Sequence, residues 1–339
     1  MTPFAHRLAA WQARHGRNHL PWQGNDPYRV WLSEIMLQQT QVATVLQYYP
    51  RFLARFPDVE SLAAAADDDV LALWSGLGYY SRARNLHHAA RQVMDEYGGQ
   101  FPRDRAGLET LKGVGRSTAA AIAVFAFGQK EAILDGNVKR LLARHAGIYG
   151  TPDQPATLAA LWAEAEARLP DDAATLRRYT QGLMDLGNGI CTRTRPRCGE
   201  CPVAADCYAY RHDATAALPE KRAKKPNPER HTVMLLARCG DRLHLYRRPD
   251  RGIWRGLWSL PEYDSVATAE TAAQTLGAIT ARATLPAITH KFTHYTLHIA
   301  PFAVTIAAPA RAADWLPQQE ALAKGLPAPV RRLIDDHFR

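Results

Sequence analysis

Apolar residues recur at every third or fourth position through the first part of the chain, up to about residue 212. Leu71, Trp74 and Leu77 give one example of this spacing, and Val138 with Leu141 and Leu142 gives another. This is the period of a helix that buries one face. The pattern therefore predicts a mainly α region over residues 1–212.

The pattern changes after residue 230 to short apolar runs that are typical of strands. A hairpin is expected around the turn Gly240-Asp241. The strands expected are His231–Arg238, Arg242–Arg248, Leu257–Leu260, Ala287–Phe292, Tyr295–Ala300 and Phe302–Ile306, and the helices expected are Ala267–Leu276 and Pro329–Phe338. Residues 231–339 are therefore predicted to form an α+β domain.

Between the two patterns lies a basic segment, which we interpret as a linker over residues 213–230. Its stretch Pro219–Arg230 holds three prolines and five basic residues. Such a composition forms no packed core. The segment could lie along an anionic ligand or be a solvated tether, and composition alone leaves both readings open.

Composition narrows the class of partner. The chain has 339 residues, 47% of them hydrophobic, with a formal net charge of +9, which suits a two-domain globular protein with an anionic partner, most often nucleic acid. No stretch approaches eighteen uncharged apolar residues, so no membrane association is expected. The polar start, Met1–Arg14, predicts no secretory segment and hence a cytoplasmic protein.

Four of the five cysteines fall within seventeen residues, as Cys191-x6-Cys198-x2-Cys201-x5-Cys207. Zinc sites more often combine two short Cys-x-x-Cys pairs. A single run with longer gaps suits a cube-shaped cluster, so the spacing favours [4Fe–4S] over zinc. The loop also carries Arg193, Arg195 and Arg197, beside an expected basic surface. Cys239 follows an apolar run and is interpreted as a small, partly buried hydrophobe.

Leu111-Lys-Gly113-Val-Gly115-Arg-Ser117 joins two helical segments near residues 105–127. The glycines would let the backbone approach a phosphate, and the N–H groups at the start of the second helix would donate to it. We expect Ser117 to cap that helix. This is the logic of a helix-hairpin-helix that grips one DNA strand without reading bases, although an ordinary turn between helices has the same pattern.

Two carboxylates stand out. Asp135 precedes a predicted helix, whose dipole would favour its ionised form, and a fixed anion can stabilise an oxocarbenium-like sugar. Glu34 lies among Trp31, Ile35 and Leu37, where burial would raise its pKa and suit a general acid. Taken singly, Asp135 could be an ordinary N-cap and Glu34 a surface glutamate. One acidic and one ionised carboxyl group is the division of labour in glycosidic bond cleavage.

These motifs, together with Gly76-Leu-Gly-Tyr79-Tyr80, Leu134–Lys139 and Ser33–Gln41, resemble the helix-hairpin-helix, Gly/Pro-rich, aspartate superfamily of DNA glycosylases, and within it the adenine DNA glycosylase (MutY) family. The resemblance implies a monomeric, monofunctional enzyme of base excision repair in the bacterial nucleoid. Its substrate would be double-stranded DNA with adenine opposite 8-oxoguanine or guanine, from which adenine is flipped out.

The resemblance also assigns roles. Glu34 would protonate adenine N7 and help activate water, and Asp135 would stabilise the sugar cation or a covalent adduct. Other family positions are the wedge residues Gln39 and Tyr79, the adenine-pocket residues Trp31 and Gln181, and the DNA contacts Gly113, Gly115, Ser117, Asn137 and Lys139.

One position separates the nearest alternatives. Bifunctional relatives that cut oxidised pyrimidines, like endonuclease III, place a lysine where this chain has Ser117, and serine cannot form the Schiff base that lyase chemistry needs. Lys139 could still trap the abasic product. A third hypothesis, a non-catalytic DNA-binding iron–sulfur protein, is disfavoured because Glu34 and Asp135 occur together.

The C-terminal half resembles a Nudix fold through Tyr246-Arg-Arg-Pro and Gly252–Pro261. A Nudix hydrolase needs a run of glutamates to hold magnesium, and the corresponding stretch offers only Glu262, Asp264 and Glu270. We therefore expect this domain to serve lesion recognition. Phe292-Thr293-His294 matches a Phe-Ser-His motif of the family that inserts opposite the lesion strand. Thr293 departs from it by adding a methyl group while keeping the hydroxyl.

Overall fold

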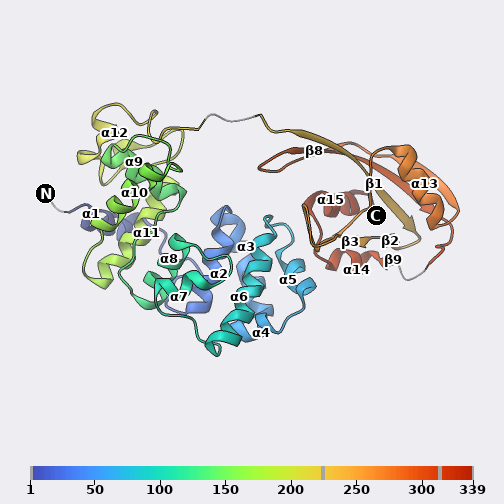
Figure 1. Cartoon of the computed structure of the whole chain (residues 1–339), viewed down its shortest axis with the longest axis horizontal. Coiled ribbons are helices and arrows are strands. Elements are labelled where there is room, and N and C mark those ends of the chain that lie inside the picture. The colour runs from blue at the N-terminus through green and yellow to red at the C-terminus, as the bar shows by residue number, and fades with distance from the viewer. Residues whose placement is uncertain (1–2, 223–225, 312–314, 338–339) are drawn as a thin grey trace. The chain divides into compact units, whose positions relative to one another are not determined.

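Helices form most of the first of the two units into which the chain divides. The computed structural model describes residues 3–222, 226–311 and 315–337. The first unit comprises Met1–Ala63 and His88–Ala223, and the second comprises Ala64–His87 and Lys224–Arg339. The helices of the first unit (Figure 1) are α1 (Phe4–His15), α2 (Pro27–Leu37), α3 (Val42–Arg55), α4 (Val59–Ala63), α7 (Arg105–Thr110), α8 (Arg116–Phe127), α9 (Gly136–Ala146), α10 (Pro155–Ala167), α11 (Ala173–Gly189) and α12 (Tyr208–Arg211).

Local signals in the sequence set the start of α2. Pro27 occupies the first helical position, and Oδ1 of Asp26 accepts a hydrogen bond from the Arg29 N–H (3.1 Å), as the Asp-Pro pair predicts. The helix is buried on most sides, with Trp31, Leu32 and Met36 all fully enclosed. It therefore holds Glu34 in a fixed, largely apolar setting.

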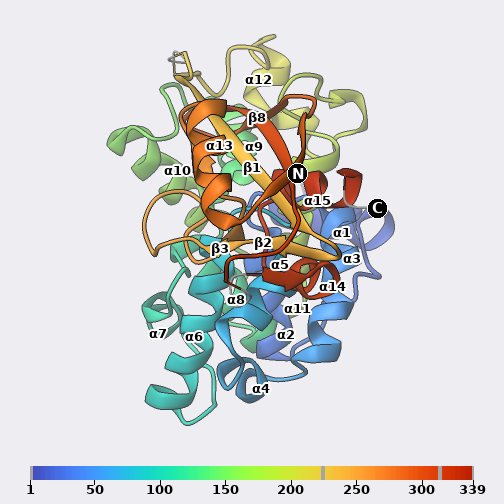
Figure 2. The ribbon, with the colours of Figure 1, turned by 90° about the vertical axis from the view of Figure 1, so that its right-hand side faces the viewer.

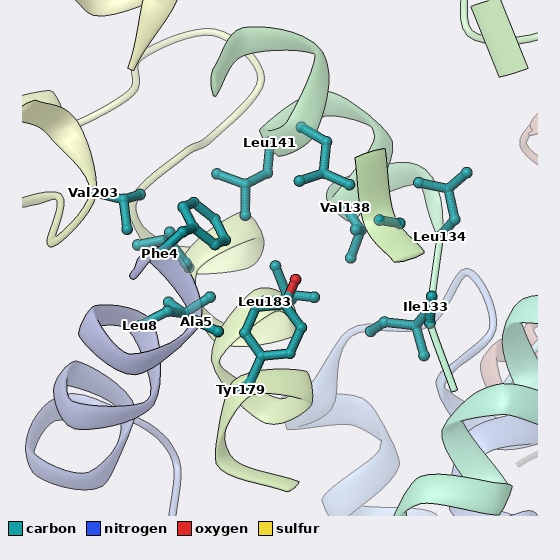
Figure 3. Packing of buried hydrophobic residues seen from close by; sticks show 14 of the residues in the cluster. Phe4, Ala5, Leu8, Ile133, Leu134, Val138, Leu141, Tyr179, Leu183 and Val203 are labelled. Carbon is teal, nitrogen blue, oxygen red and sulfur yellow. The ribbon is translucent and has the colours of Figure 1, made fainter. Parts of the chain in front are cut away.

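The core of the first unit forms where α1, α9 and α11 meet. Phe4 and Leu8 of α1 pack with Leu141 of α9 and Leu183 of α11 (Figure 3). The three consecutive residues Ala132, Ile133 and Leu134, which lie just before α9, belong to the same buried cluster. Because these side chains are anchored in the core, the position of the next residue, Asp135, is fixed as well.

The second unit is built on a mixed sheet with the strand order β6-β8-β1-β2-β9, in which β5 also pairs with β1 and β7 with β8. The strands are β1 (Glu229–Cys239), β2 (Arg242–His244), β5 (Glu262–Tyr263), β6 (Ile279–Thr284), β7 (Ile288–Lys291), β8 (Thr296–Ile306) and β9 (Trp315–Pro317), with β3 (Tyr246–Arg247) and β4 (Trp258–Ser259) as a separate pair. The helices are α13 (Val266–Leu276), α14 (Gln318–Ala323) and α15 (Ala328–His337).

Helix α13 covers one face of this sheet (Figure 2). Its Ala269 and Ala273 pack with Val233 and Leu235 of β1. Met234 and Leu236, which alternate with them, are also buried, so the central strand is enclosed on both faces. The predicted fold class, an α region followed by an α+β domain, is confirmed.

The strands of the sheet differ in detail from those predicted. The turn Gly240-Asp241 joins β1 to β2 as predicted, but the strands predicted on either side of Pro301 are a single strand, β8. The Pro301 carbonyl accepts from the Leu285 N–H (3.0 Å), and the nitrogen of Pro301 points to the same edge of β8 as this carbonyl. At that edge, Pro301 lies opposite the gap between β6 and β7. No partner strand needs a donor there, and proline is tolerated. The predicted strand Arg242–Arg248 is divided into β2 and β3, which belong to different sheets, and β5, β6 and β9 were not predicted.

The predicted linker is packed at its start. Ala214 and Leu218 form a small buried cluster with Ala209 of α12, and the Leu218 carbonyl accepts from Nε of Arg144 (2.8 Å). At the other end, β1 already begins at Glu229. The possible tether therefore shortens to the residues between, of which 223–225 lie outside the described residues.

Residues 64–87, predicted within the helical region, group with the second unit. They include α5 (Asp67–Trp74) and the start of α6 (Ser81–Tyr97). The Tyr80 hydroxyl donates to the Leu326 carbonyl (2.6 Å), and Nε1 of Trp258 donates to Asp68 (3.3 Å). These contacts are long-range in sequence, which is why periodicity could not predict them. Within the described residues, none of the helices is long and apolar enough to cross a bilayer.

Candidate active site

Glu34 and Asp135 line one cavity of about 910 Å³ in the first unit, together with residues of α1, α8 and α11. Glu34 is half-buried, and within the described residues it forms no ion pair. Burial first, and then repulsion by Asp135, raise the pKa of Glu34 to about 8. At neutral pH its carboxyl group is therefore mostly protonated and able to donate a proton.

Asp135 is the N-cap of α9. The N–H groups of Asn137 and Val138 both donate to its Oδ1 (2.9 and 2.8 Å). Asp135 is thus an N-cap, as the bland interpretation predicted. Both capping hydrogen bonds use Oδ1, and the side chain that carries Oδ2 is exposed. The positive end of the helix dipole and two donors hold a carboxylate at the cavity wall.

The helix-hairpin-helix consists of α7, the turn at 111–115 and α8. Gly113 has φ +83°, which favours glycine, while a Cβ at Gly115 would meet no atom within 4 Å. Gly115 is itself the N-cap of α8 and provides no capping side chain. The first N–H groups of α8 therefore remain available to an anion.

Ser117 was expected to cap this helix, and that expectation is wrong. It lies one residue inside the helix, and its hydroxyl accepts from the Leu134 N–H (2.9 Å). The hydroxyl thus ties the hairpin to the residue that precedes Asp135. The contact joins residues seventeen apart, so no local pattern announces it.

Gln181 also lines the cavity, from α11. Its amide Nε2 donates to Asp185 (3.0 Å), and its Oε1 accepts from Gln23 (3.4 Å). Asp185 in turn pairs with Arg17 at 2.6 Å. The sequence interpretation missed Arg17, Gln23 and Asp185, because they form this network only when the segment after α1 packs against α11.

Trp31, predicted from the sequence to lie in the adenine pocket, does not line this cavity. Its side chain is completely buried and packs on Tyr28 and Phe101. Val30 lines the cavity instead.

Of the two DNA contacts predicted after Asp135, Asn137 lines the cavity and Lys139 does not. The Asn137 side chain also accepts from Arg140 (3.1 Å). Arg140 donates further to the Cys191 carbonyl (2.8 Å). The start of α9 is thereby connected to the cysteine loop.

The two predicted wedge residues share an unusual backbone conformation. Gln39 has φ +58° and Tyr79 has φ +46°, and within the described residues only Asp213 and Trp254 are further non-glycine examples. Both are exposed, and the Tyr79 ring lies under the Arg82 guanidinium at 5.5 Å. Such strain clusters at binding sites.

Thr293 and His294 form the exposed tip of the hairpin between β7 and β8. The Phe292 N–H donates to the Tyr295 carbonyl (2.8 Å) and closes the turn. The Phe292 ring packs against Trp254 at 5.2 Å and Tyr295 at 4.7 Å. A rigid aromatic base therefore presents the two polar side chains.

The four clustered cysteines line one small apolar cavity between α9 and the loop. Nη1 of Arg144 lies 3.4 Å from Sγ of Cys191, as a donor to a ligand sulfur would. Burial raises the pKa of Cys201 to about 12, and a metal centre bound by this sulfur would displace its proton. The donor set fits an iron–sulfur cluster. Of the loop arginines, Arg197 pairs with Glu200 (2.9 Å), while Arg193 and Arg195 are exposed.

Comparisons with known families agree with this geometry. Residues 32–166 match the model of the HhH-GPD superfamily of base excision DNA repair proteins, residues 191–207 match the iron-sulfur binding domain of endonuclease III, and residues 232–336 match a NUDIX domain. The predicted [4Fe–4S] cofactor is thereby confirmed over zinc.

Solved structures repeat the fold of the helical part. A thermostable thymine-DNA glycosylase aligns with a TM-score of 0.56 and 30% identity, over 61% of this chain and 95% of that one. An endonuclease III–DNA complex aligns with a TM-score of 0.52 and 21% identity, over 62% and 94%.

Among curated relatives, the adenine DNA glycosylase of Buchnera aphidicola subsp. Schizaphis graminum is 33% identical and covers 98% of both chains. The mouse adenine DNA glycosylase is 36% identical over 77% of this chain and 60% of its own. A thymine-DNA glycosylase from Aeropyrum pernix is 33% identical but covers only 61% of this chain. The helical site, the iron–sulfur loop and the Nudix-like domain occur here in one chain, which belongs to the adenine DNA glycosylase family.

Proposed function

We propose that the chain hydrolyses the N-glycosidic bond of adenine that is paired with 8-oxoguanine or guanine in duplex DNA. The observation that carries the proposal is the carboxylate pair in one cavity, with the pKa of Glu34 raised to about 8 and Asp135 held by two N–H groups. Two carboxyl groups in different surroundings are what glycosidic cleavage requires.

In the proposed reaction the flipped adenine enters the cavity and Glu34 donates its proton to N7. The bond between C1′ and N9 breaks, and its electron pair leaves with the base. Asp135 stabilises the positive charge on the sugar. Water then attacks C1′ and gives a proton to the Glu34 carboxylate, which restores the starting state and leaves an abasic site.

Ser117 supports a reaction without strand cleavage. Its hydroxyl is engaged with the Leu134 N–H, and it offers no amine for a Schiff base. Lys139 does not line the cavity. Base release is therefore expected to leave the DNA backbone intact.

Within the same proposal, Gln181 reads the adenine edge, and the hairpin tip at Thr293 and His294 faces the opposite strand. Gln39 and Tyr79 fill the space left by the flipped base. One chain carries every group, so a monomer suffices, and chromosomal DNA as substrate would place it in the bacterial nucleoid.

The test is a single-turnover assay on duplexes that carry adenine opposite 8-oxoguanine, guanine, cytosine or thymine, with and without alkali. We expect adenine release opposite the first two bases and strand breakage only after alkali. Cleavage of an oxidised pyrimidine without alkali, with adenine left in place, would contradict the proposal.

A second assay tests the opposite-strand assignment. Thr293→Ser removes only the methyl group and should change the ratio of rates for 8-oxoguanine and guanine mispairs. The matched control, Thr271→Ser on the exposed side of α13, should leave this ratio unchanged. Equal ratios for both variants would remove the hairpin tip from lesion reading.

A further inference from the structure

A group of metal-ligand side chains lies in the second unit, separate from both sites described above. Glu229, His231 and His298 each offer one ligand atom, and these atoms all lie within 4.8 Å of one another. β1 and β8 are parallel neighbours, with His231 directly opposite His298. Glu229 and His231 project from the same face because side chains alternate along a strand. Arg230, between them, lies over the Tyr295 ring instead, at 4.6 Å.

The ring of His298 stacks on that of His231 at 4.8 Å and is held by a neighbouring hydroxyl group. Its Nδ1 lies 3.3 Å from the Thr289 hydroxyl on the neighbouring strand β7. Its Nε2 is buried, has no hydrogen-bond partner among the residues that the structure describes, and lies 3.6 Å from Oε2 of Glu229. Metal-bound histidines donate their second ring N–H to an oxygen of this kind, which fixes the ring and its tautomer.

We propose that Glu229, His231 and His298 bind one divalent cation of the zinc class. Two imidazoles and a carboxylate are a common zinc ligand set, with bonds of about 2.0–2.2 Å and a fourth position left to water. Magnesium and calcium prefer sets made only of oxygen. Glu229 and His231 are both exposed, so they can rotate to close the ligand distances without disturbing packing.

The location gives the site a structural consequence. Glu229 is the first residue of β1, where the linker ends, and His298 is the third residue of β8, just after the hairpin tip at 293–294. A bound ion joins these two strands at the end of the sheet that carries the tip. Because the unfolded chain does not hold the three ligands together, zinc raises the thermal stability of the folded domain.

The experiment uses the full chain, free of any affinity tag and loaded with its iron–sulfur cluster. Zinc is titrated against a chromophoric chelator, and metal content is measured after dialysis. We expect one zinc per chain in addition to the iron. His298→Ala and His231→Ala should each weaken zinc binding by more than tenfold, and Thr289→Val should weaken it by roughly tenfold, the range of outer ligand contacts.

Matched controls are His88→Ala and Glu220→Gln, which remove an exposed histidine and an exposed glutamate elsewhere. Their zinc affinity should equal that of the unmodified chain. The zinc-free variants His231→Ala and His298→Ala should keep the base-release rate of the parent, which separates lost zinc binding from misfolding. Because His231 is exposed, its variant remains informative if His298→Ala is unstable.

X-ray absorption at the zinc edge distinguishes this site from the cysteines. Nitrogen and oxygen neighbours near 2.0 Å without sulfur near 2.3 Å support the proposal. Zinc–sulfur distances, no zinc beyond the iron, or undiminished binding in the double variant His231→Ala/His298→Ala would overturn it and leave an ordinary contact between neighbouring strands.

Discussion

The carboxylates of the two units have opposite surroundings. In the first unit, Glu34 and Asp135 share a cavity, and within the described residues neither forms an ion pair. In the second unit, Glu262 of β5 pairs with Arg248, and Glu270 of α13 pairs with Arg282 of β6, each at 2.5 Å. A carboxylate engaged by a guanidinium is not free to hold magnesium. Residues 232–336 match a NUDIX domain, but these two glutamates are engaged in ion pairs within it.

The largest effect is expected from Glu34→Gln. The amide fills the same space but cannot donate a proton to the leaving base, so single-turnover adenine release should fall on the order of 10²–10⁴-fold while DNA binding persists. Glu60→Gln, at an exposed position, is the control and should keep the parent rate. Release near the normal rate in Glu34→Gln would remove this residue from the acid role.

Asp135→Asn separates chemistry from capping. Asparagine is as good an N-cap as aspartate, so the melting temperature should change little, whereas the lost charge should slow release by roughly 10²–10³-fold. Asp172→Asn, at the N-cap of α11, makes the same chemical change away from the cavity. If both variants turn over equally well, Asp135 is a cap and nothing more.

Removal of a cluster ligand should act on DNA binding more than on the cavity. Cys198→Ser is expected to lower the iron content and the visible absorption of the cluster. It should also weaken duplex binding severalfold, because the loop that positions the exposed Arg193 and Arg195 would no longer be held by the cluster. Cys239→Ser should retain both iron and affinity. Full affinity in iron-free Cys198→Ser would exclude the loop from DNA contact.

The raised pKa of Glu34 predicts how rate and stability depend on pH. Release should fall about tenfold per pH unit above pH 8, as the proton to be donated is lost. The folded-state pKa lies above the ordinary 4.5, so the stability of the folded chain declines between pH 4.5 and 8. Glu34→Gln lacks this penalty, so its melting temperature should exceed that of the parent increasingly from pH 5 to pH 8. A constant difference would mean that the carboxyl group titrates normally.

The smallest effect is expected from the paired glutamates of the second unit. Glu262→Gln and Glu270→Gln should leave adenine release within about twofold, and neither variant nor parent should hydrolyse nucleoside triphosphates with magnesium. Magnesium-dependent hydrolysis that Glu262→Gln abolishes would break the contrast between the two regions.

Short-range sequence patterns predicted many of the structural elements. The cysteine spacing, the Gly-Val-Gly turn and the Asp-Pro helix start each operate within a few residues, and the structure contains the expected elements at those positions. The short apolar runs after residue 230 also predicted the sheet. The break predicted at Pro301 was wrong, because a proline interrupts a strand only where a neighbouring strand needs its N–H.

Long-range packing decided what those signals could not. The sequence by itself determined which residues have the right chemistry: a glutamate in an apolar run, an aspartate before a helix, four cysteines in one loop. Only the tertiary structure buried Trp31, tied Ser117 to Leu134, set Asp185 behind Gln181 and brought Glu34 and Asp135 to one cavity. The physical reason is that pKa, burial and hydrogen-bond partners depend on neighbours in space, and for these residues the neighbours come from helices far apart in the chain.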